Sequence, residues 1–134
     1  MLDERPSAAE LIAAVADFLQ SKVAPHLDAH TSFHMKVAVN ALRIVEREVR
    51  AGENVAEVER VRALCGEAGG ALPPGDLHAL NQELCRRIAD GRLSPDDPAL
   101  ARHLVASALY RLAIDNPSYP ALAAARKHWP ELFS

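Results

Sequence analysis

The sequence predicts an all-α fold, a compact bundle of five to six helices whose neighbours are mostly antiparallel. Apolar residues recur at every third or fourth position in each long segment, which is the spacing of an amphipathic helix. No segment shows the sustained period-two alternation of a strand, and the loops are short enough to favour antiparallel neighbours. The length of 134 residues predicts a single helical domain over residues 1–134. Its core must be mostly aliphatic, because aromatic residues make up only 4% of the chain.

The first helix has a clear beginning. Ser7 and Glu10 have the spacing of a capping box, in which each side chain satisfies a backbone N–H of the first turn. Apolar residues follow at helical spacing as far as Val23. Pro25 ends the helix, because the residue before a proline avoids the α-helical region.

The segment Thr31–Arg50 predicts one long helix around which the others pack. It begins at Thr31 or Ser32, or one turn earlier at Asp28, and Gly52 ends it in the left-handed conformation. One narrow side is polar and mostly basic: Lys36, Asn40, Arg43, Arg47 and Arg50. A much wider arc is apolar: Phe33, Val37, Ala38, Ala41, Leu42, Val45 and Val49. An arc this wide needs neighbours on more than one side, so we expect the central helix of a bundle.

Asn54 and Glu57 predict the beginning of a third helix over Val55–Cys65, which Gly66 ends. The stretch 66–75 holds four of the six glycines and a pair of prolines, which indicates a flexible loop. A fourth helix is expected over Asp76–Asp90.

The fifth helix begins at Asp97 and Pro98, a carboxylate cap followed by proline at the first helical position, and runs to about Asp115. Its predicted core face is Leu104, Val105, Ala108, Leu109 and Leu112. A short last helix over Ala121–Lys127 leads to three apolar residues that we expect to pack onto the body or onto a partner: Trp129, Leu132 and Phe133.

Charge and composition reduce the number of functions that the chain is expected to have. The formal net charge is −3 with both signs interspersed, which argues against a nucleic-acid-binding protein. No apolar run approaches the ~20 residues of a membrane span, and the first residues lack the apolar stretch of a signal peptide. Cys65 and Cys85 are interpreted as reduced core thiols, with a disulfide between them as the alternative. We therefore expect a cytoplasmic protein of a bacterium or similar cell, with neither nucleic acid nor membrane as a partner.

The sequence contains no familiar catalytic motif. It lacks a phosphate-binding loop, a dinucleotide-binding glycine motif, Cys-x-x-Cys and His-Glu-x-x-His. We name no catalytic residue and expect no cofactor. The absence of these motifs favours a protein that is not an enzyme, but it does not exclude an unusual enzyme.

The basic side of the central helix is the first candidate binding site. Lys36, Asn40, Arg43 and Arg47 could hold a phosphate or a carboxylate, because arginine presents a bidentate fork to such groups. A solvated helix face has the same pattern, and that alternative stays open.

Other polar residues form weaker candidates. His34 and Glu48 lie inside the apolar arc, which predicts buried polar groups, and a carboxylate in such a place is costly unless it is paired. His26, His30 and His34 are spaced four apart and would line one face of a continuous helix as metal ligands. Pro25 interrupts regular helix there. The alternative is therefore that His26 and His30 are loop residues and that His34 lies at the edge of the core.

A polar stripe on the fifth helix is the last candidate. It consists of His103, Ser107, Tyr110 and Arg111. This stripe is either the exposed face of that helix or the lining of a groove against the last helix.

Three stretches together resemble a known family: Arg5–Leu11, Phe33–Glu48 and Leu112–Tyr119. The family consists of small, uncharacterised bacterial helical proteins, a domain of unknown function. Its genes tend to lie beside those of aminoglycoside-phosphotransferase-like kinases and acyl-CoA dehydrogenases. The resemblance implies a role linked to such enzymes, in acyl-CoA or related catabolism, and supplies no catalytic residues. Lys36 stands where arginine is expected in relatives, which keeps the cation but not the bidentate fork.

Three functions are consistent with these observations. The preferred one is a non-catalytic accessory or interaction protein that docks onto a kinase-like or dehydrogenase-like partner or onto itself. The second is a binding module for a small anionic metabolite, phosphorylated or CoA-linked. The third is a metal-dependent enzyme that uses the three histidines.

Overall fold

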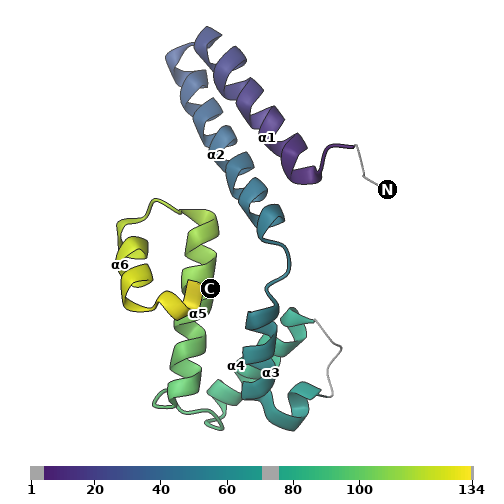
Figure 1. Ribbon diagram of the computed structural model, residues 1–134, viewed down its shortest axis with the longest axis vertical. Coiled ribbons are helices and arrows are strands. Elements are labelled where there is room, and N and C mark those ends of the chain that lie inside the picture. Colours follow the sequence, from purple (N-terminus) through teal and green to yellow (C-terminus); the bar gives the residue numbers. More distant parts are fainter. Residues whose placement is uncertain (1–4, 71–75, 134) are drawn as a thin grey trace. The chain divides into compact units, whose positions relative to one another are not determined.

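A computed structural model describes residues 5–70 and 76–133, without the side chains of residues 67–70. The prediction of an all-α fold is confirmed, since the described residues form six α-helices and no strand (Figure 1). The helices are α1 (Ala8–Phe18), α2 (Ala29–Ala51), α3 (Val55–Gly70), α4 (Leu77–Ala89), α5 (Pro98–Asp115) and α6 (Pro120–His128). Three short turns complete the fold: a π-helix over Leu19–Val23 and 3₁₀ helices over Ala24–His26 and Pro130–Phe133.

The contacts within the chain divide it into two compact units. The first is Met1–Gly52 and the second is Glu53–Ser134. Each unit is described by itself below, and the single domain expected from the chain length remains a prediction.

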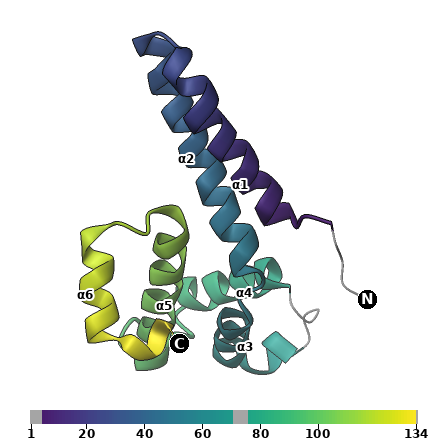
Figure 2. The same cartoon turned by 45° about the horizontal axis from the view of Figure 1, so that its top comes forward.

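The first unit is a helical hairpin in which α1 and α2 lie side by side and antiparallel (Figures 1 and 2). The predicted capping box is present, with the Ser7 hydroxyl accepting from the Glu10 N–H and the Glu10 carboxylate accepting from the Ser7 N–H. Asp28 caps α2 by accepting from the Thr31 N–H, so the earlier of the expected starts is the observed one. Small residues, Ala9 and Ala16, are buried against α2, which lets the two backbones approach closely.

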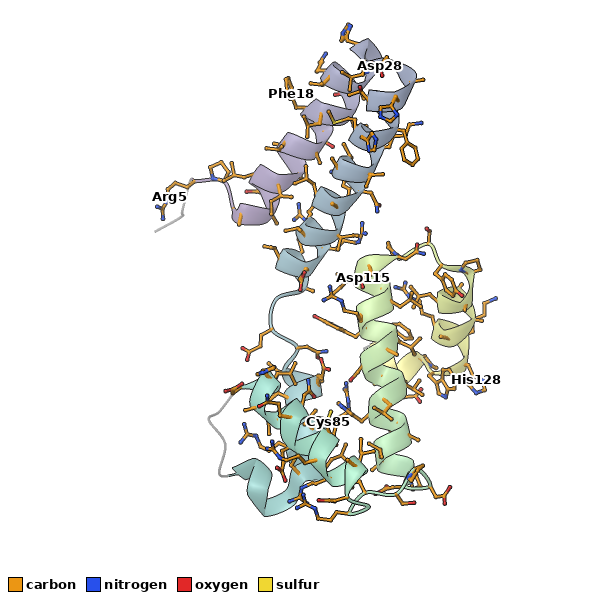
Figure 3. The ribbon with its side chains drawn as sticks, turned by 180° about the vertical axis from the view of Figure 1, so that it is seen from behind. Arg5, Phe18, Asp28, Cys85, Asp115 and His128 are labelled. Atoms are coloured by element: carbon orange, nitrogen blue, oxygen red, sulfur yellow. The ribbon has the colours of Figure 1, made fainter. Side chains whose placement is uncertain are left out.

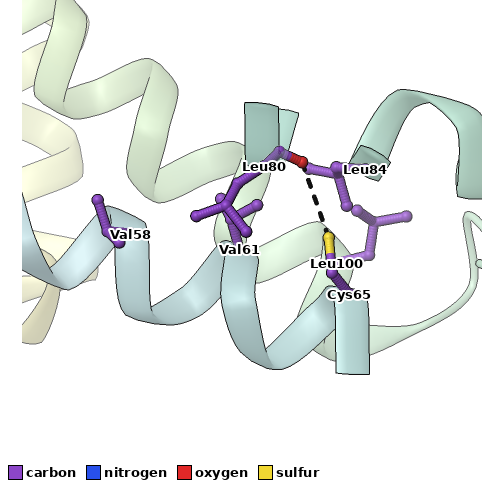
Figure 4. Close-up of a cluster of buried hydrophobic side chains, with 6 residues drawn as sticks. All are labelled: Val58, Val61, Cys65, Leu80, Leu84 and Leu100. Carbon is purple, nitrogen blue, oxygen red and sulfur yellow. Dashed lines mark hydrogen bonds between the residues drawn. The ribbon is translucent and has the colours of Figure 1, made fainter. Parts of the chain in front are cut away.

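The second unit has the larger apolar core. Six side chains from α3, α4 and α5 form it: Val58, Val61, Cys65, Leu80, Leu84 and Leu100 (Figure 4). The Cys65 thiol donates to the backbone oxygen of Leu80 over 3.7 Å. Burial raises the pKa of this thiol, which is what a structural core cysteine shows.

Gly66 marks the end of the regular part of α3, as predicted. Its backbone has φ 58°, in the region that glycine adopts without steric cost, and a kink there separates the rest of α3. The flexible loop expected over residues 66–75 lies only partly within the described residues. Residues 67–70 continue as helix, and residues 71–75 lie outside the described part of the chain.

The predicted core face of α5 is only partly correct, because Leu109 and Leu112 are half-buried whereas Leu104, Val105 and Ala108 are exposed. Leu104 is 49% exposed, whereas the buried residues are Leu100, His103, Ala106 and Ile114. This helix is apolar around most of its circumference, so the spacing of its apolar residues predicts a helix but does not select which side is buried.

The last helix begins at Pro120 and buries Leu122 and Ala125. After it the chain turns so that Leu132 and Phe133 are half-buried. The Arg126 guanidinium lies 5.2 Å from the centre of the Phe133 ring, a cation–π arrangement. No helix of the described residues is both long and apolar enough to cross a membrane.

Candidate functional site

The basic side of α2 lines a shallow cavity in the hairpin. The cavity has a volume of about 260 Å³ and is bounded by Gln20, Ala24, Met35, Lys36, Val39, Asn40 and Arg43. The structure therefore brings together three of the four candidate ligand-binding residues, Lys36, Asn40 and Arg43, and adds Gln20 from the opposite helix. A cavity of this size with one ammonium and one guanidinium on its wall suits a small anion.

Arg43 is already engaged by groups of the protein. Its guanidinium donates to the Asp17 carboxylate and to the Gln20 side-chain oxygen at 3.4 Å, and it lies 3.6 Å from Glu46. The hydrogen bond to Asp17 raises the pKa of Arg43 further above its ordinary value. Lys36 forms no ion pair with any residue that the structure describes, so its charge is the more accessible of the two.

Arg47 does not join the cavity. It is half-buried, does not line the cavity and interacts with another group. The role of all four residues in binding a ligand remains a prediction.

The predicted burial of His34 and Glu48 is not observed. Both side chains are exposed. The reason is that the apolar arc carrying them is largely uncovered, because within the hairpin α1 covers only one side of α2.

The three histidines do not form a metal centre. Among the described residues, no group of three His, Cys, Asp or Glu side chains could hold a metal ion. The His30 and His34 rings are neighbours, with centroids 4.7 Å apart, on the first turns of α2. His26 belongs to a separate 3₁₀ turn, and the extended backbone of Leu27 breaks the continuous helix that would place all three on one face.

The most prominent surface of the hairpin is apolar. Seven large side chains that a monomer would normally bury are exposed on it, and we call them the hairpin surface: Leu11, Val15, Phe18, Phe33, Val37, Val45 and Val49. Phe33 is the extreme case at 63% exposed, and Phe18 projects outward from α1 (Figure 3). Large exposed apolar side chains that gather on one surface mark interaction sites in soluble proteins.

Val15 and Val45 of the hairpin surface lie away from the basic cavity. The ion pair of Asp17 with Arg43 places the polar sides of α1 and α2 on the same flank of the hairpin. At helical spacing, Val15 of α1 and Val45 of α2 fall on the other flank. The hairpin therefore has one polar flank that could bind a ligand and one apolar flank that could bind a protein.

A buried histidine in the second unit was not predicted. His103 is 3% exposed, and its Nδ1 accepts from Arg60 Nε at 3.3 Å. Burial lowers the pKa of His103, the Arg60 charge lowers it further, and the Glu57 carboxylate opposes them. The ring is therefore neutral and carries its proton on Nε2. The sequence has no specific signal for this pair, because it groups His103 with Ser107, Tyr110 and Arg111 in one polar stripe.

Arg60 also borders a cavity of about 240 Å³. Tyr110 contributes to its wall, as do Asn54, Ala56, Ala106, Ala113, Leu132 and Phe133. The polar stripe expected on α5 is thus divided, with His103 in the core, Tyr110 at this cavity and Arg111 on the surface. The Ser107 hydroxyl oxygen is buried and has no hydrogen-bond partner among the described residues.

Both cysteine thiols are free, but they differ in their exposure to solvent. Cys65 is buried, whereas Cys85 is exposed, which corrects the expectation that both are core residues (Figure 3). Cys85 follows the buried Leu84 on α4, and a residue next to a buried one on a helix points to a different side.

Comparison with known proteins identifies one family. Residues 25–119 match the family described as Domain of unknown function (DUF6285). The matched span runs from the turn before α2 to the turn after α5. Comparison with curated proteins and with solved structures finds no match.

Proposed function

The chain belongs to the DUF6285 family of unknown function, and we propose that it is a non-catalytic interaction protein that docks through its hairpin surface. The observation that supports this proposal most strongly is the exposure of the seven large apolar side chains. Leaving them in water forgoes about 25 cal/mol for every Å² of apolar area that a partner would cover.

Two kinds of partner are consistent with the hairpin surface. One is a helical face of a phosphotransferase-like or acyl-CoA dehydrogenase-like enzyme, the neighbours that the sequence resemblance implies. The other is a second copy of the chain. We place the protein in the cytoplasm, a proposal that the two free thiols support.

Site-specific photo-crosslinking in cells tests the docking role. A photoreactive benzoylphenylalanine is introduced at Val45, on the hairpin surface, and as a control at Lys36, on the opposite side of α2. The proposal expects a discrete cross-linked protein, identified by mass spectrometry, from position 45 and not from position 36. No product from position 45, or equal products from both positions, would contradict it.

A second candidate function is binding of a small anionic metabolite, phosphorylated or CoA-linked, in the cavity of α2. The cavity supports this candidate because it brings Lys36, Asn40 and Arg43 together. A ligand that binds only the folded protein raises its melting temperature by mass action.

Thermal shift with inorganic phosphate and with coenzyme A tests this candidate. We expect a shift that Lys36→Ala abolishes. Lys36 is the informative position because Arg43→Ala would also remove the contact with Asp17. Lys22→Ala, on the exposed part of the π-helix, is the matched control. A shift that survives Lys36→Ala, or no shift with either ligand, would rule out this cavity as an anion site.

A further inference from the structure

We propose that the cavity beside Arg60 in the second unit binds a small monocarboxylic acid. The carboxylate of the acid pairs with the Arg60 guanidinium, and its apolar part lies against the cavity walls. The site belongs wholly to the second unit and shares no residue with the hairpin surface or with the cavity of α2. It is therefore tested separately from both functions proposed above.

Most of the cavity wall is apolar. Ala56 of α3 and Ala106 and Ala113 of α5 leave open space because their side chains are small. The last 3₁₀ turn returns to α5 (Figures 1 and 2), and its Leu132 and Phe133 form a further part of the wall. An apolar wall that carries a few polar groups is the usual composition of a small-molecule site.

Arg60 supplies the charge of the site. Its side chain is half-buried and forms no ion pair with any residue that the structure describes. Its Nε–H donates to the neutral ring of His103 at 3.3 Å, which holds the guanidinium in place without neutralising it. The other N–H groups of the guanidinium remain available as donors. A partly buried charge without a counter-ion is costly, and a bound carboxylate removes this cost.

Tyr110 supplies a second donor from the facing helix. Its side chain is half-buried at the cavity wall, and its hydroxyl has no hydrogen-bond partner in the described part of the chain. The phenol can therefore donate to a carboxylate oxygen. The third polar residue of the wall, Asn54, is already engaged, since it accepts from the Glu57 N–H and donates to the Glu57 carboxylate, both at 3.3 Å.

The charges around the cavity favour a carboxylate over a phosphate. Arg60 is the only cation on the wall. The Glu57 carboxylate is close enough to His103 to raise its pKa against the effect of burial, so a negative charge already lies nearby. A single guanidinium beside an acidic group suits a ligand with one negative charge, and its planar fork matches the geometry of a carboxylate.

The volume of the cavity limits the size of the acid. The cavity has a volume of about 240 Å³. A water molecule occupies about 30 Å³ in the liquid, so the cavity has room for about eight groups of that size. Butyrate and hexanoate lie within this limit, whereas coenzyme A and nucleotides exceed it. The ligand class is therefore a short-chain or medium-chain carboxylic acid.

A titration of the full ¹⁵N-labelled chain with sodium butyrate, followed by NMR, tests this inference. We expect saturable shifts of backbone amides in α3, α5 and the last turn. Acetate should bind more weakly because it lacks an apolar part, and butyramide, which has the same shape as butyrate but no charge, should not bind. Shifts that do not saturate, an equal response to butyramide, or shifts confined to α2 would overturn the proposal.

Three variants test the roles of the side chains. We expect Arg60→Gln to raise the dissociation constant of butyrate at least tenfold, and Tyr110→Phe to raise it about tenfold, the effect of losing one hydrogen bond to a charged group. Arg111→Gln is the matched control, because it removes the same charge from an exposed position on α5, and it should leave the constant unchanged.

Tyr110→Phe keeps the ring and removes only the hydroxyl, so it remains informative if the loss of Arg60 unfolds the second unit. An unchanged dissociation constant in Tyr110→Phe, or an equal loss of affinity in Arg111→Gln, would contradict the proposed site.

Discussion

At the scale of single residues, the His103 and Arg60 pair shows how burial decides the charge of a group. The histidine is buried beside a guanidinium, so its neutral form is favoured, and its Nδ1 can accept the hydrogen bond from Arg60. The nearby Glu57 carboxylate reduces the shift without reversing it. A residue that the sequence placed on an exposed stripe is therefore part of the interior.

This lowered pKa predicts a pH dependence of folding stability. Below the ordinary histidine pKa of about 6.5 the unfolded chain takes up a proton that folded His103 does not. The contribution of His103 to stability is therefore complete above about pH 6.5 and is lost as the pH falls through the lowered folded value. We expect His103→Gln to reduce the loss of unfolding free energy between pH 7.5 and 5.5, measured by urea unfolding. An unchanged loss would contradict the proposed protonation state.

The two polar candidates on α2 show that the periodicity of a helix does not by itself predict which residues are buried. His34 and Glu48 were expected to be buried because their neighbours along the helix are apolar. Periodicity identifies the chemical character of a helix side, but a second element is needed to bury it, and the hairpin offers only α1. Their exposure is therefore informative about what is absent from the isolated hairpin.

At the scale of helices, the beginnings were predictable and the buried sides were only partly so. Ser7, Asp28, Asn54, Asp76 and Asp97 each accept a hydrogen bond from a backbone N–H at the start of a helix. Such capping is local, because the side chain and the N–H are two or three residues apart, so the sequence alone reveals it. The buried side of α5 depends on residues far away in the sequence, and the prediction there agrees with the structure only at the half-buried Leu109 and Leu112.

Alanine substitutions on α5 test the corrected face. Leu100 is 2% exposed, whereas Leu104, one turn later, is 49% exposed. We expect Leu100→Ala to lower the unfolding free energy by about 2–5 kcal/mol, because it leaves a cavity in the core. Leu104→Ala should cost less than about 1 kcal/mol. The opposite ranking in denaturant unfolding would restore the face that the sequence favoured.

The cap of α2 gives a second prediction at this scale. Asp28 accepts from the Thr31 N–H at 2.8 Å, and this bond lowers the pKa of Asp28. Asp28→Ala should lower the unfolding free energy by about 0.5–2 kcal/mol, and Asp28→Asn by less, because asparagine is also a good cap. Equal losses in the two variants would show that the cap does not stabilise the helix.

At the scale of the whole molecule, the sequence predicted the class of fold and a need for neighbours of α2 that the hairpin by itself does not meet. The wide apolar arc of α2 required neighbours on more than one side, and the hairpin contributes one. The candidate binding residues were partly predictable, since three of the four line one cavity. The assembly could not be predicted from periodicity, because the same pattern describes a helix buried within one chain and a helix buried between two.

The central claim is that the hairpin surface is a protein contact, and the molar mass of the purified chain in solution tests it most directly. With a second copy as the partner, light scattering should give twice the 14.5 kDa mass of the chain. Val37→Glu should return the mass to that of a single chain with its helix content unchanged, and Lys36→Glu, the neighbouring position on the polar side, should remain dimeric. A wild-type protein that has the mass of one chain at micromolar concentration and gives no cross-linked product from position 45, or a Val37→Glu variant that stays dimeric, would contradict the account.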